Sequence, residues 1–380
     1  MLSLPPLSLY VHFPWCVQKC PYCDFNSHSL KGQIPEAAYI SRLLDDLQAD
    51  LSWVQGRPLH SIFIGGGTPS LISAEGIARL LQGIKQQVGF ADKAEITLEA
   101  NPGTFETERF AGFVEAGVNR LSIGVQSLQA EQLSALGRIH DPQQARAAAS
   151  HAQSLALQSF NLDLMHGLPG QSIAAAMADL DGVIALQPPH ISWYQLTIEP
   201  NTAFASRPPQ LPEDDTLAEI YERGQQRLAE AGYQQYEVSA YAKPGHQSQH
   251  NRNYWQFGDY LGIGCGAHSK ITLAEQQQII RCEKVKHPQG YLDLTRSQRY
   301  RTWPVEETER PFEFFMNQLR LLEPTAKRQF TERTGLPLST AEQALKRAKT
   351  QGLLTENAEH WQCTALGRRF LNNILDQLVD

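Results

Sequence analysis

Short apolar runs, rich in β-branched residues, recur along the first half of the chain, and each is followed by a polar turn. They occupy residues 7–13, 61–67, 95–101, 120–127, 159–169 and 190–200. Apolar runs of this length, bounded by turn residues, are typical of buried strands. The pattern therefore predicts six strands in the first 200 residues.

The segments between these runs carry apolar residues at helical spacing, as at 37–51, 74–88 and 108–118. Strands that alternate with helices predict parallel strands joined by crossover helices. We therefore expect an α/β fold built as a partial (β/α)6 barrel, residues 1–200. In such sheets the reactive groups collect at the carboxyl ends of the strands, so the motifs that end the runs should meet at one rim.

The pattern changes after about residue 200. A Pro-rich connector at 207–215 precedes a helical stretch at 216–232, and we interpret residues 201–304 as a region that caps the barrel. Residues 305–380 contain helices, then an alternating pair of short strands around a polar turn, then a last helix. This order predicts a winged-helix-like α+β domain at the C-terminus.

Composition and charge limit the classes of partner. The 380 residues are 42% hydrophobic and 19% charged, which is typical of a globular protein. The net charge of −7 gives no general attraction to nucleic acid, and the C-terminal segment holds 10 Lys and Arg against 11 Asp and Glu. No apolar run reaches the roughly 20 residues of a membrane span, and the start lacks the features of a signal peptide. We expect a cytoplasmic protein that binds no nucleic acid.

Three of the six cysteines, Cys16, Cys20 and Cys23, fall within eight residues. In a reducing compartment this spacing indicates metal binding rather than disulfides. Three thiolates can bind three irons of a [4Fe-4S] cluster and leave the fourth iron open. The alternative is a structural zinc ion, which needs a fourth ligand such as His12 or His28.

The cysteine spacing, followed one β-α unit later by "GGGTP", resembles the radical S-adenosylmethionine (SAM) superfamily. Gly65, Gly66 and Gly67 allow the backbone to approach a ligand closely, and Thr68 adds a hydroxyl. In that superfamily SAM chelates the open iron, and an electron from the cluster cleaves the SAM molecule. The resemblance therefore implies a [4Fe-4S] cluster and SAM as cofactors.

Four further motifs, "EANPG", "GVQSL", "LGRIH" and "NLDLMHGLPGQ", follow in an order that resembles the oxygen-independent coproporphyrinogen III oxidase group. A carboxylate such as Glu99 or Asp163 can accept both hydrogens of a ribose diol, and Arg138 can pair with a carboxylate. Taken singly, each of these residues could equally be a surface ion pair or a helix cap. The resemblance implies that the SAM-binding residues are Tyr10, Tyr22, Gly66, Gly67, Thr68, Glu99, Gln126, Arg138 and Asp163.

The chain departs from those oxidases at two places. Phe25 stands where they carry a fourth cysteine, and only fifteen residues precede Cys16. In addition, "HNRNYW" at 250–255 resembles the mark of the HemW family of haem chaperones. Histidine is a common axial ligand of haem iron, so His250 is the candidate ligand, and Tyr254 and Trp255 could flank a porphyrin. His246 and His268 remain open alternatives.

The resemblance to HemW implies a protein that binds haem as cargo and passes it to haemoproteins of the respiratory chain at the membrane. A homodimer is left open, as is covalent attachment of the haem. The alternative is a radical SAM enzyme that oxidatively decarboxylates coproporphyrinogen III. Both functions use the same cofactors, so the SAM-binding residues do not separate them.

Overall fold

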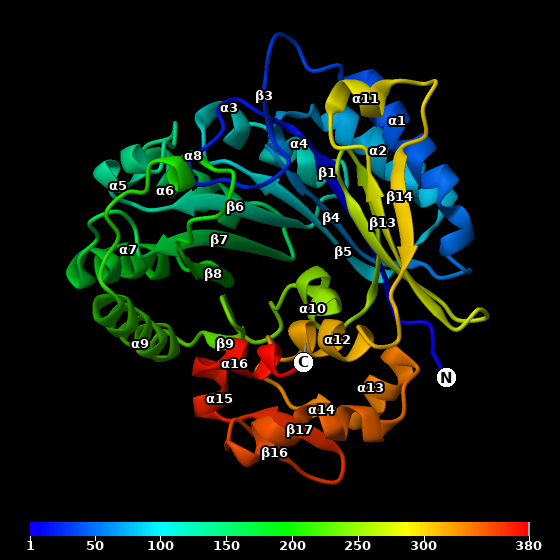
Figure 1. Cartoon of the computed structure of the whole chain (residues 1–380). Coiled ribbons are helices and arrows are strands. Elements are labelled where there is room, and N and C mark those ends of the chain that lie inside the picture. The colour runs from blue at the N-terminus through cyan, green and yellow to red at the C-terminus, as the bar shows by residue number, and fades with distance from the viewer. Residues whose placement is uncertain (379–380) are drawn as a thin grey trace.

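The computed structural model describes residues 1–378, and a curved sheet forms its centre (Figure 1). Six neighbouring parallel strands carry the apolar runs, and they follow the order of the chain. They are β1 (Leu7–Phe13), β4 (Leu59–Gly66), β5 (Phe90–Ala100), β6 (Arg120–Gln126), β7 (Ser159–His166) and β8 (His190–Gln195). The six predicted strands and their parallel arrangement are confirmed.

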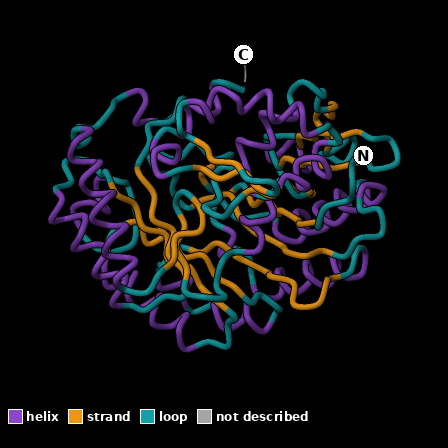
Figure 2. Tube along the Cα trace, turned by 90° about the horizontal axis from the view of Figure 1, so that it is seen from below, coloured by secondary structure: helices purple, strands orange, loops and turns teal. Residues whose placement is uncertain are grey.

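Helices connect the strands and pack on the outer face of the sheet, so that the strands lie inside and most helices lie on the outside of the molecule (Figure 2). Local sequence starts several of them: Ser73 accepts the Gly76 N–H, and Asp141 with Gln144 forms a capping box. The long helices are α1 (Glu36–Ala49), α2 (Ala74–Gln87), α6 (Pro142–Ser154), α7 (Ile173–Ala185) and α9 (Asp214–Glu230). The short ones are η1 (Leu51–Trp53), η2 (Pro69–Leu71), α3 (Thr104–Thr107), α4 (Phe110–Glu115), α5 (Ala130–Ala135) and α8 (Ala203–Ser206).

The segment expected to cap the barrel extends its sheet at both edges. A parallel strand, β11 (Asp259–Gly264), pairs with β1, and an antiparallel pair joins β8 on the other side. The sheet therefore has 12 strands among the described residues. The added strands are β9 (Gln234–Glu237), β10 (Ala240–Ala242), β12 (His268–Leu273), β13 (Gln278–Lys284) and β14 (Arg299–Pro304), with α11 (Pro288–Leu292) between the last two.

Two short strands and one helix of this part of the molecule position the candidate residues. β2 (Trp15–Cys16) and β3 (His28–Ser29) pair in parallel and enclose the cysteine loop. Helix α10 (Gln249–Trp255) carries "HNRNYW" and lies between the curved sheet and the C-terminal part of the chain (Figure 1).

The C-terminal part folds as helices around a small three-stranded sheet, in agreement with the predicted winged-helix-like domain. Phe314, Phe315, Phe330 and Trp361 pack against one another in its core, in edge-to-face pairs and one stacked pair, Phe315 with Phe330. Its elements are α12 (Arg310–Gln318), β15 (Thr325–Ala326), α13 (Lys327–Thr334), α14 (Leu338–Thr350), β16 (Leu354–Glu356), β17 (His360–Cys363), α15 (Ala365–Arg369) and α16 (Leu371–Asp376). The boundaries expected between the three segments, at 200 and 304, stay predictions.

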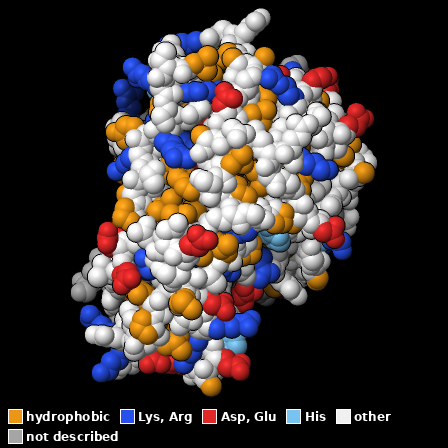
Figure 3. Space-filling model, turned by 90° about the vertical axis from the view of Figure 1, so that its right-hand side faces the viewer, with side chains coloured by type: hydrophobic (Ala, Val, Ile, Leu, Met, Phe, Trp, Pro, Cys, Tyr) orange, Lys and Arg blue, Asp and Glu red, His pale blue; other side chains and the backbone are white. Residues whose placement is uncertain are grey.

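The C-terminal part docks on the rest through α10. Arg252 Nη2 forms a 2.9 Å ion pair with Glu323, and the Arg320 guanidinium stacks 4.3 Å from the centre of a Trp255 ring. On the face that Figure 3 shows, acidic and basic side chains are interspersed. Within residues 1–378, no helix combines the length and the apolar character needed to cross a membrane.

Candidate functional site

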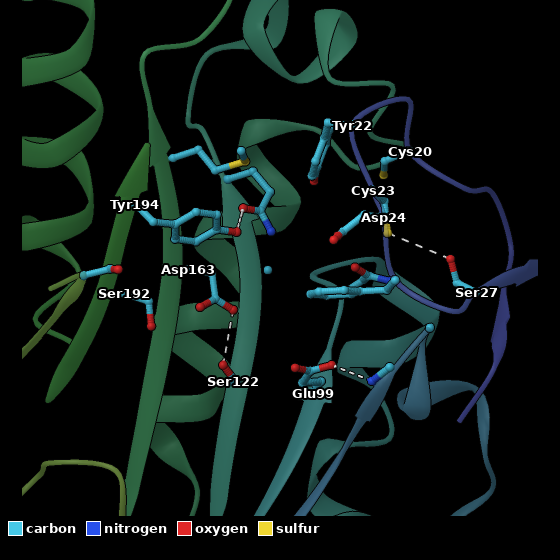
Figure 4. A pocket seen from close by; sticks show the side chains of 18 of the residues that line it. Cys20, Tyr22, Cys23, Asp24, Ser27, Glu99, Ser122, Asp163, Ser192 and Tyr194 are labelled. Carbon is cyan, nitrogen blue, oxygen red and sulfur yellow. Dashed lines mark hydrogen bonds between the residues drawn. The ribbon is translucent and has the colours of Figure 1, made fainter. Parts of the chain in front are cut away.

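The three closely spaced cysteines lie on a loop that is closed at its base. The Leu30 N–H donates to the Cys16 carbonyl at 2.8 Å, and within the loop the Cys23 N–H donates to the Cys20 carbonyl at 3.2 Å. All three thiols are free. The closed loop places them together on one wall of a cavity of about 510 Å³, and Figure 4 shows Cys20 and Cys23 at its edge.

The surroundings of these thiols favour a positively charged partner. Burial raises the pKa of the Cys16 thiol and of the Cys23 thiol, and the neighbouring cysteines add to the rise. Three thiolates side by side would repel one another and would lose hydration, so they need cations between them. An iron–sulfur cluster supplies such cations, and the three-thiol set fits it.

A single zinc ion fits this site less well. Within residues 1–378, no group of three or more His, Cys, Asp and Glu side chains converges as one ion requires. His12, one suggested fourth ligand, already uses both ring nitrogens: Nδ1 contacts the Tyr10 hydroxyl at 3.0 Å, and Nε2 contacts the Asn26 carbonyl at 2.8 Å. A cubane cluster needs no such convergence, because each sulfur binds a different iron.

The glycine-rich end of β4 packs directly against the strand that leads into the cysteine loop. The Gly67 N–H donates to the Phe13 carbonyl at 2.6 Å, and the Thr68 N–H donates to the Trp15 carbonyl at 2.8 Å. A Cβ atom on Gly67 would lie 2.5 Å from that Trp15 oxygen. Gly66 has φ +114° and also lies too close to its neighbours for a side chain. The glycines are thus required by packing between strands, and they line the cavity as well.

Two half-buried carboxyl groups project into the same cavity from β5 and β7 (Figure 4). Burial, and then the charge of Asp163, raises the pKa of Glu99 to about 8, although Glu99 accepts the Gly66 N–H at 3.0 Å. Burial also raises the pKa of Asp163, whose oxygens accept from Asn161 at 2.8 Å and from Ser122 at 3.2 Å. Both groups can therefore change protonation when a polar or cationic ligand binds.

Arg138 links the cysteine loop to the strand ends. Its Nη1 lies 3.6 Å from the Cys20 sulfur, and its Nη2 donates to Asn101 Oδ1 at 2.6 Å and to the Gly124 carbonyl at 2.9 Å. Gln126, at the end of β6, accepts from the Tyr194 hydroxyl at 2.8 Å. These contacts hold both side chains rigidly at the cavity wall.

Most of the residues expected to bind SAM meet in this cavity, and Tyr10 is the exception. Tyr22, Gly66, Gly67, Thr68, Glu99, Gln126, Arg138 and Asp163 line it together with the three cysteines. Tyr10 lines a second cavity of about 930 Å³, whose wall shares Gly66 and Glu99 with the first. The sequence reasoning missed Tyr194, Ser192 and Arg320, which also line the first cavity. The position of Tyr194 at a strand end could have identified it, but nothing local marks Arg320.

His250 lies on the wall of the second cavity. It is 2% exposed, and its ring packs between Phe63, at 5.1 Å between centroids, and Tyr254, at 5.0 Å. Burial, with a smaller contribution from Arg120, lowers the pKa of His250 to about 3, so its ring is neutral at pH 7. Neutral imidazole is the form that binds metals.

One ring nitrogen of His250 is fixed and the other has no partner. Nδ1 lies 3.0 Å from Ser61 Oγ, which lies 2.7 Å from Ser8 Oγ. Asn253, also from "HNRNYW", donates to Ser8 Oγ at 2.9 Å. Nε2 is buried and makes no hydrogen bond with any described residue.

Phe25 lines both cavities and is 58% exposed.

Comparison with known proteins places this geometry among radical SAM proteins. The profile of the Radical SAM superfamily matches residues 10–181, and that of the HemN C-terminal domain matches residues 305–370. The solved structure of coproporphyrinogen III oxidase (HemN) from Escherichia coli, described as a radical SAM enzyme, superposes with a TM-score of 0.83. It covers 99% of this chain and 90% of that chain at 24% identity, which shows that the fold is shared.

The similarity to curated relatives is much higher. The heme chaperone HemW of Escherichia coli (strain K12) is 57% identical over 378 residues, covering 99% of each chain. HemW of Haemophilus influenzae is 58% identical over 380 residues, covering 99% of this chain and 98% of the relative. A mitochondrial radical S-adenosyl methionine domain-containing protein 1 of Bos taurus is 36% identical, covering 93% of this chain and 75% of the relative. The chain belongs to the HemW family of radical SAM proteins.

Proposed function

We propose that this protein is a haem chaperone that holds a [4Fe-4S] cluster and SAM in the smaller cavity and carries haem in the larger one. The observation that carries the proposal is the neutral, buried His250, which lines a cavity of about 930 Å³ and whose Nε2 has no hydrogen-bond partner among the described residues. A cavity of this size, lined by aromatic groups, suits a large planar ligand. The names of the HemW relatives support haem as that ligand.

The cluster and SAM would be held by the residues that line the smaller cavity. Cys16, Cys20 and Cys23 would bind the cluster, and the glycine-rich end of β4 would border the methionine part of SAM. When bound, the cluster supplies one-electron chemistry at the SAM sulfonium. Arg138 would hold the cluster loop against the strand ends, and Glu99 and Asp163 would accept from the ribose hydroxyls.

Ligation of haem iron by His250 selects one tautomer of its ring. Nε2 must offer a lone pair, so Nδ1 must carry the proton and donate it to Ser61 Oγ. Phe63 and Tyr254 would limit the rotation of the ring. His268 is disfavoured as the main ligand because its side chain is 53% exposed, whereas His250 is buried.

The recipients in this proposal are haemoproteins of the respiratory chain, reached in the cytoplasm at the membrane surface. Delivery there needs only a transient contact with the acceptor.

The proposal is tested by titrating haem into the purified protein and following the Soret band. The His250→Ala variant should bind haem more weakly and with a shifted Soret band, because the nitrogen ligand is lost. His246→Ala is the matched control, because His246, the other alternative near α10, is not among the residues that line either cavity. Identical titrations of the wild-type protein and the His250→Ala variant would place the ligand elsewhere.

A further inference from the structure

Positive charge exceeds negative charge among the side chains that line the larger cavity. The cations of its lining are Lys19 and Lys286, and its carboxyl groups are Asp24 and Glu99. The raised pKa of Glu99, about 8, keeps this group mostly protonated at pH 7. Two positive charges therefore face one negative charge, that of Asp24.

The histidines of the lining do not alter this balance. Burial lowers the pKa of each one below its ordinary value of 6.5, so that all are mostly neutral at pH 7. They are His12, His28, His250 and His268. The cavity thus combines a neutral, aromatic inner wall with a surplus of positive charge from its two lysines.

Lys286 has a fixed backbone and an exposed side chain. Its carbonyl accepts from Asn26 Nδ2 at 2.9 Å and from the Cys265 thiol at 2.7 Å. Its side chain is 66% exposed, and its ammonium group pairs with Glu283 at 2.7 Å. Glu283 also pairs with Arg301 at 2.8 Å, so this carboxylate is shared between two cations and one positive charge remains uncompensated.

Lys19 lies on the border of the two cavities, within the cysteine loop. Its ammonium group donates to the Phe25 carbonyl at 3.1 Å and to the Ser27 carbonyl at 3.4 Å. Among the described residues it has no carboxylate partner within ion-pair distance. Its charge is therefore also available to an anion bound in the larger cavity.

These two exposed lysines line the same cavity as the buried His250. Haem has a matching polarity: its ring is apolar, and its two propionate carboxylates project from one edge. We propose that Lys286, assisted by Lys19, binds the propionates of haem while the iron faces His250. This inference rests on the proposed function, and it adds the group that sets the orientation of the haem and the preference for a dicarboxylate porphyrin.

The test compares haem with haem dimethyl ester, which has the same ring and iron but lacks both carboxylate charges. Each ligand is titrated into the full-length protein and the Soret band is followed. Lys286→Gln should weaken haem binding roughly threefold to tenfold, the range for an ion pair at a partly enclosed site, and leave ester binding unchanged. The double variant Lys19→Gln/Lys286→Gln should weaken haem binding further. Lys286→Arg should retain the affinity, and Lys346→Gln, an exposed lysine of α14, is the control.

The outcomes separate this inference from the proposed function. Haem binding that responds to His250→Ala but not to Lys286→Gln or the double variant would overturn the propionate role alone. An equal loss of affinity for haem and for the ester would also overturn it, because a general change of the cavity would explain both. If the wild-type protein bound no haem, the proposed function and this inference would fail together.

Discussion

Glu99 should couple SAM binding to the release of a proton. Its side chain lies on the wall shared by the two cavities, and its pKa is raised to about 8 by burial and by the charge of Asp163. At pH 7, one unit below this pKa, roughly nine in ten Glu99 side chains are protonated. SAM carries a sulfonium charge, and its ribose hydroxyls donate hydrogen bonds, so both features favour the ionised carboxylate and lower its pKa.

The raised pKa of Glu99 determines how SAM affinity changes with pH and how many protons binding releases. Below pH 8 the free protein holds a proton that the complex gives up, so SAM affinity should rise with pH up to about 8 and then level off. At pH 7 binding should release up to about 0.9 proton from Glu99, and the release should fall toward zero above pH 9. The Glu99→Gln variant has no carboxyl proton to lose at this position, so the proton release due to Glu99 should vanish in it.

Calorimetry of SAM binding in phosphate and in Tris measures the number of protons released, because the two buffers differ in their heat of ionisation. The protein should carry its reconstituted cluster, and Glu115→Gln, on the exposed side of α4, serves as the control. Proton release that is equal in Glu99→Gln and in the wild-type protein would refute the role of Glu99. Tight SAM binding without any proton release in the wild-type protein would refute it as well.

Two further predictions concern the glycine-rich end of β4 and the cysteine loop. Gly66→Ala should lower the free energy of unfolding by about 2–5 kcal/mol in urea titrations, because the residue has a left-handed φ and the new Cβ would lie 2.6 Å from the His12 ring. Gly103→Ala, where a Cβ meets nothing within 4 Å, should change stability little, and equal effects of the two substitutions would contradict the packing argument. Cys20→Ser should prevent assembly of an intact cluster, and the same brown absorbance after anaerobic reconstitution would show that Cys20 is not a ligand.

The strands and the first cavity could be predicted from the sequence because their signals are local. The buried parallel strands are continuous apolar runs, and the rule that loops converge at their carboxyl ends brought Glu99 and Asp163 to one rim. Tyr10 lines the second cavity rather than the first. In β1 successive side chains point to opposite faces, and Tyr10 shares its face with His12, whose ring it contacts on the side of the second cavity.

The remaining features depend on contacts between distant segments. The pairing of β11 with β1 joins Leu7 to Asp259, and no local pattern near residue 259 specifies a parallel neighbour that far away. Arg320 reaches the first cavity only because the C-terminal part docks on α10, where it stacks on Trp255. The free Nε2 of His250 likewise follows from the position of Ser61 beside its other nitrogen. Sequence spacing within one segment does not encode these relations.

The most direct test of the central claim is a haem-transfer measurement. Haem-loaded protein with an intact cluster is incubated anaerobically with the apo form of a respiratory b-type haemoprotein, the two are separated, and the haem in each is quantified by its absorbance. We expect haem to move to the acceptor from the wild-type protein, and a His250→Ala sample offering the same amount of haem to deliver it no better than free haem does. An acceptor that stays empty, or one that is filled equally by both proteins, would show that this protein does not pass haem on through His250.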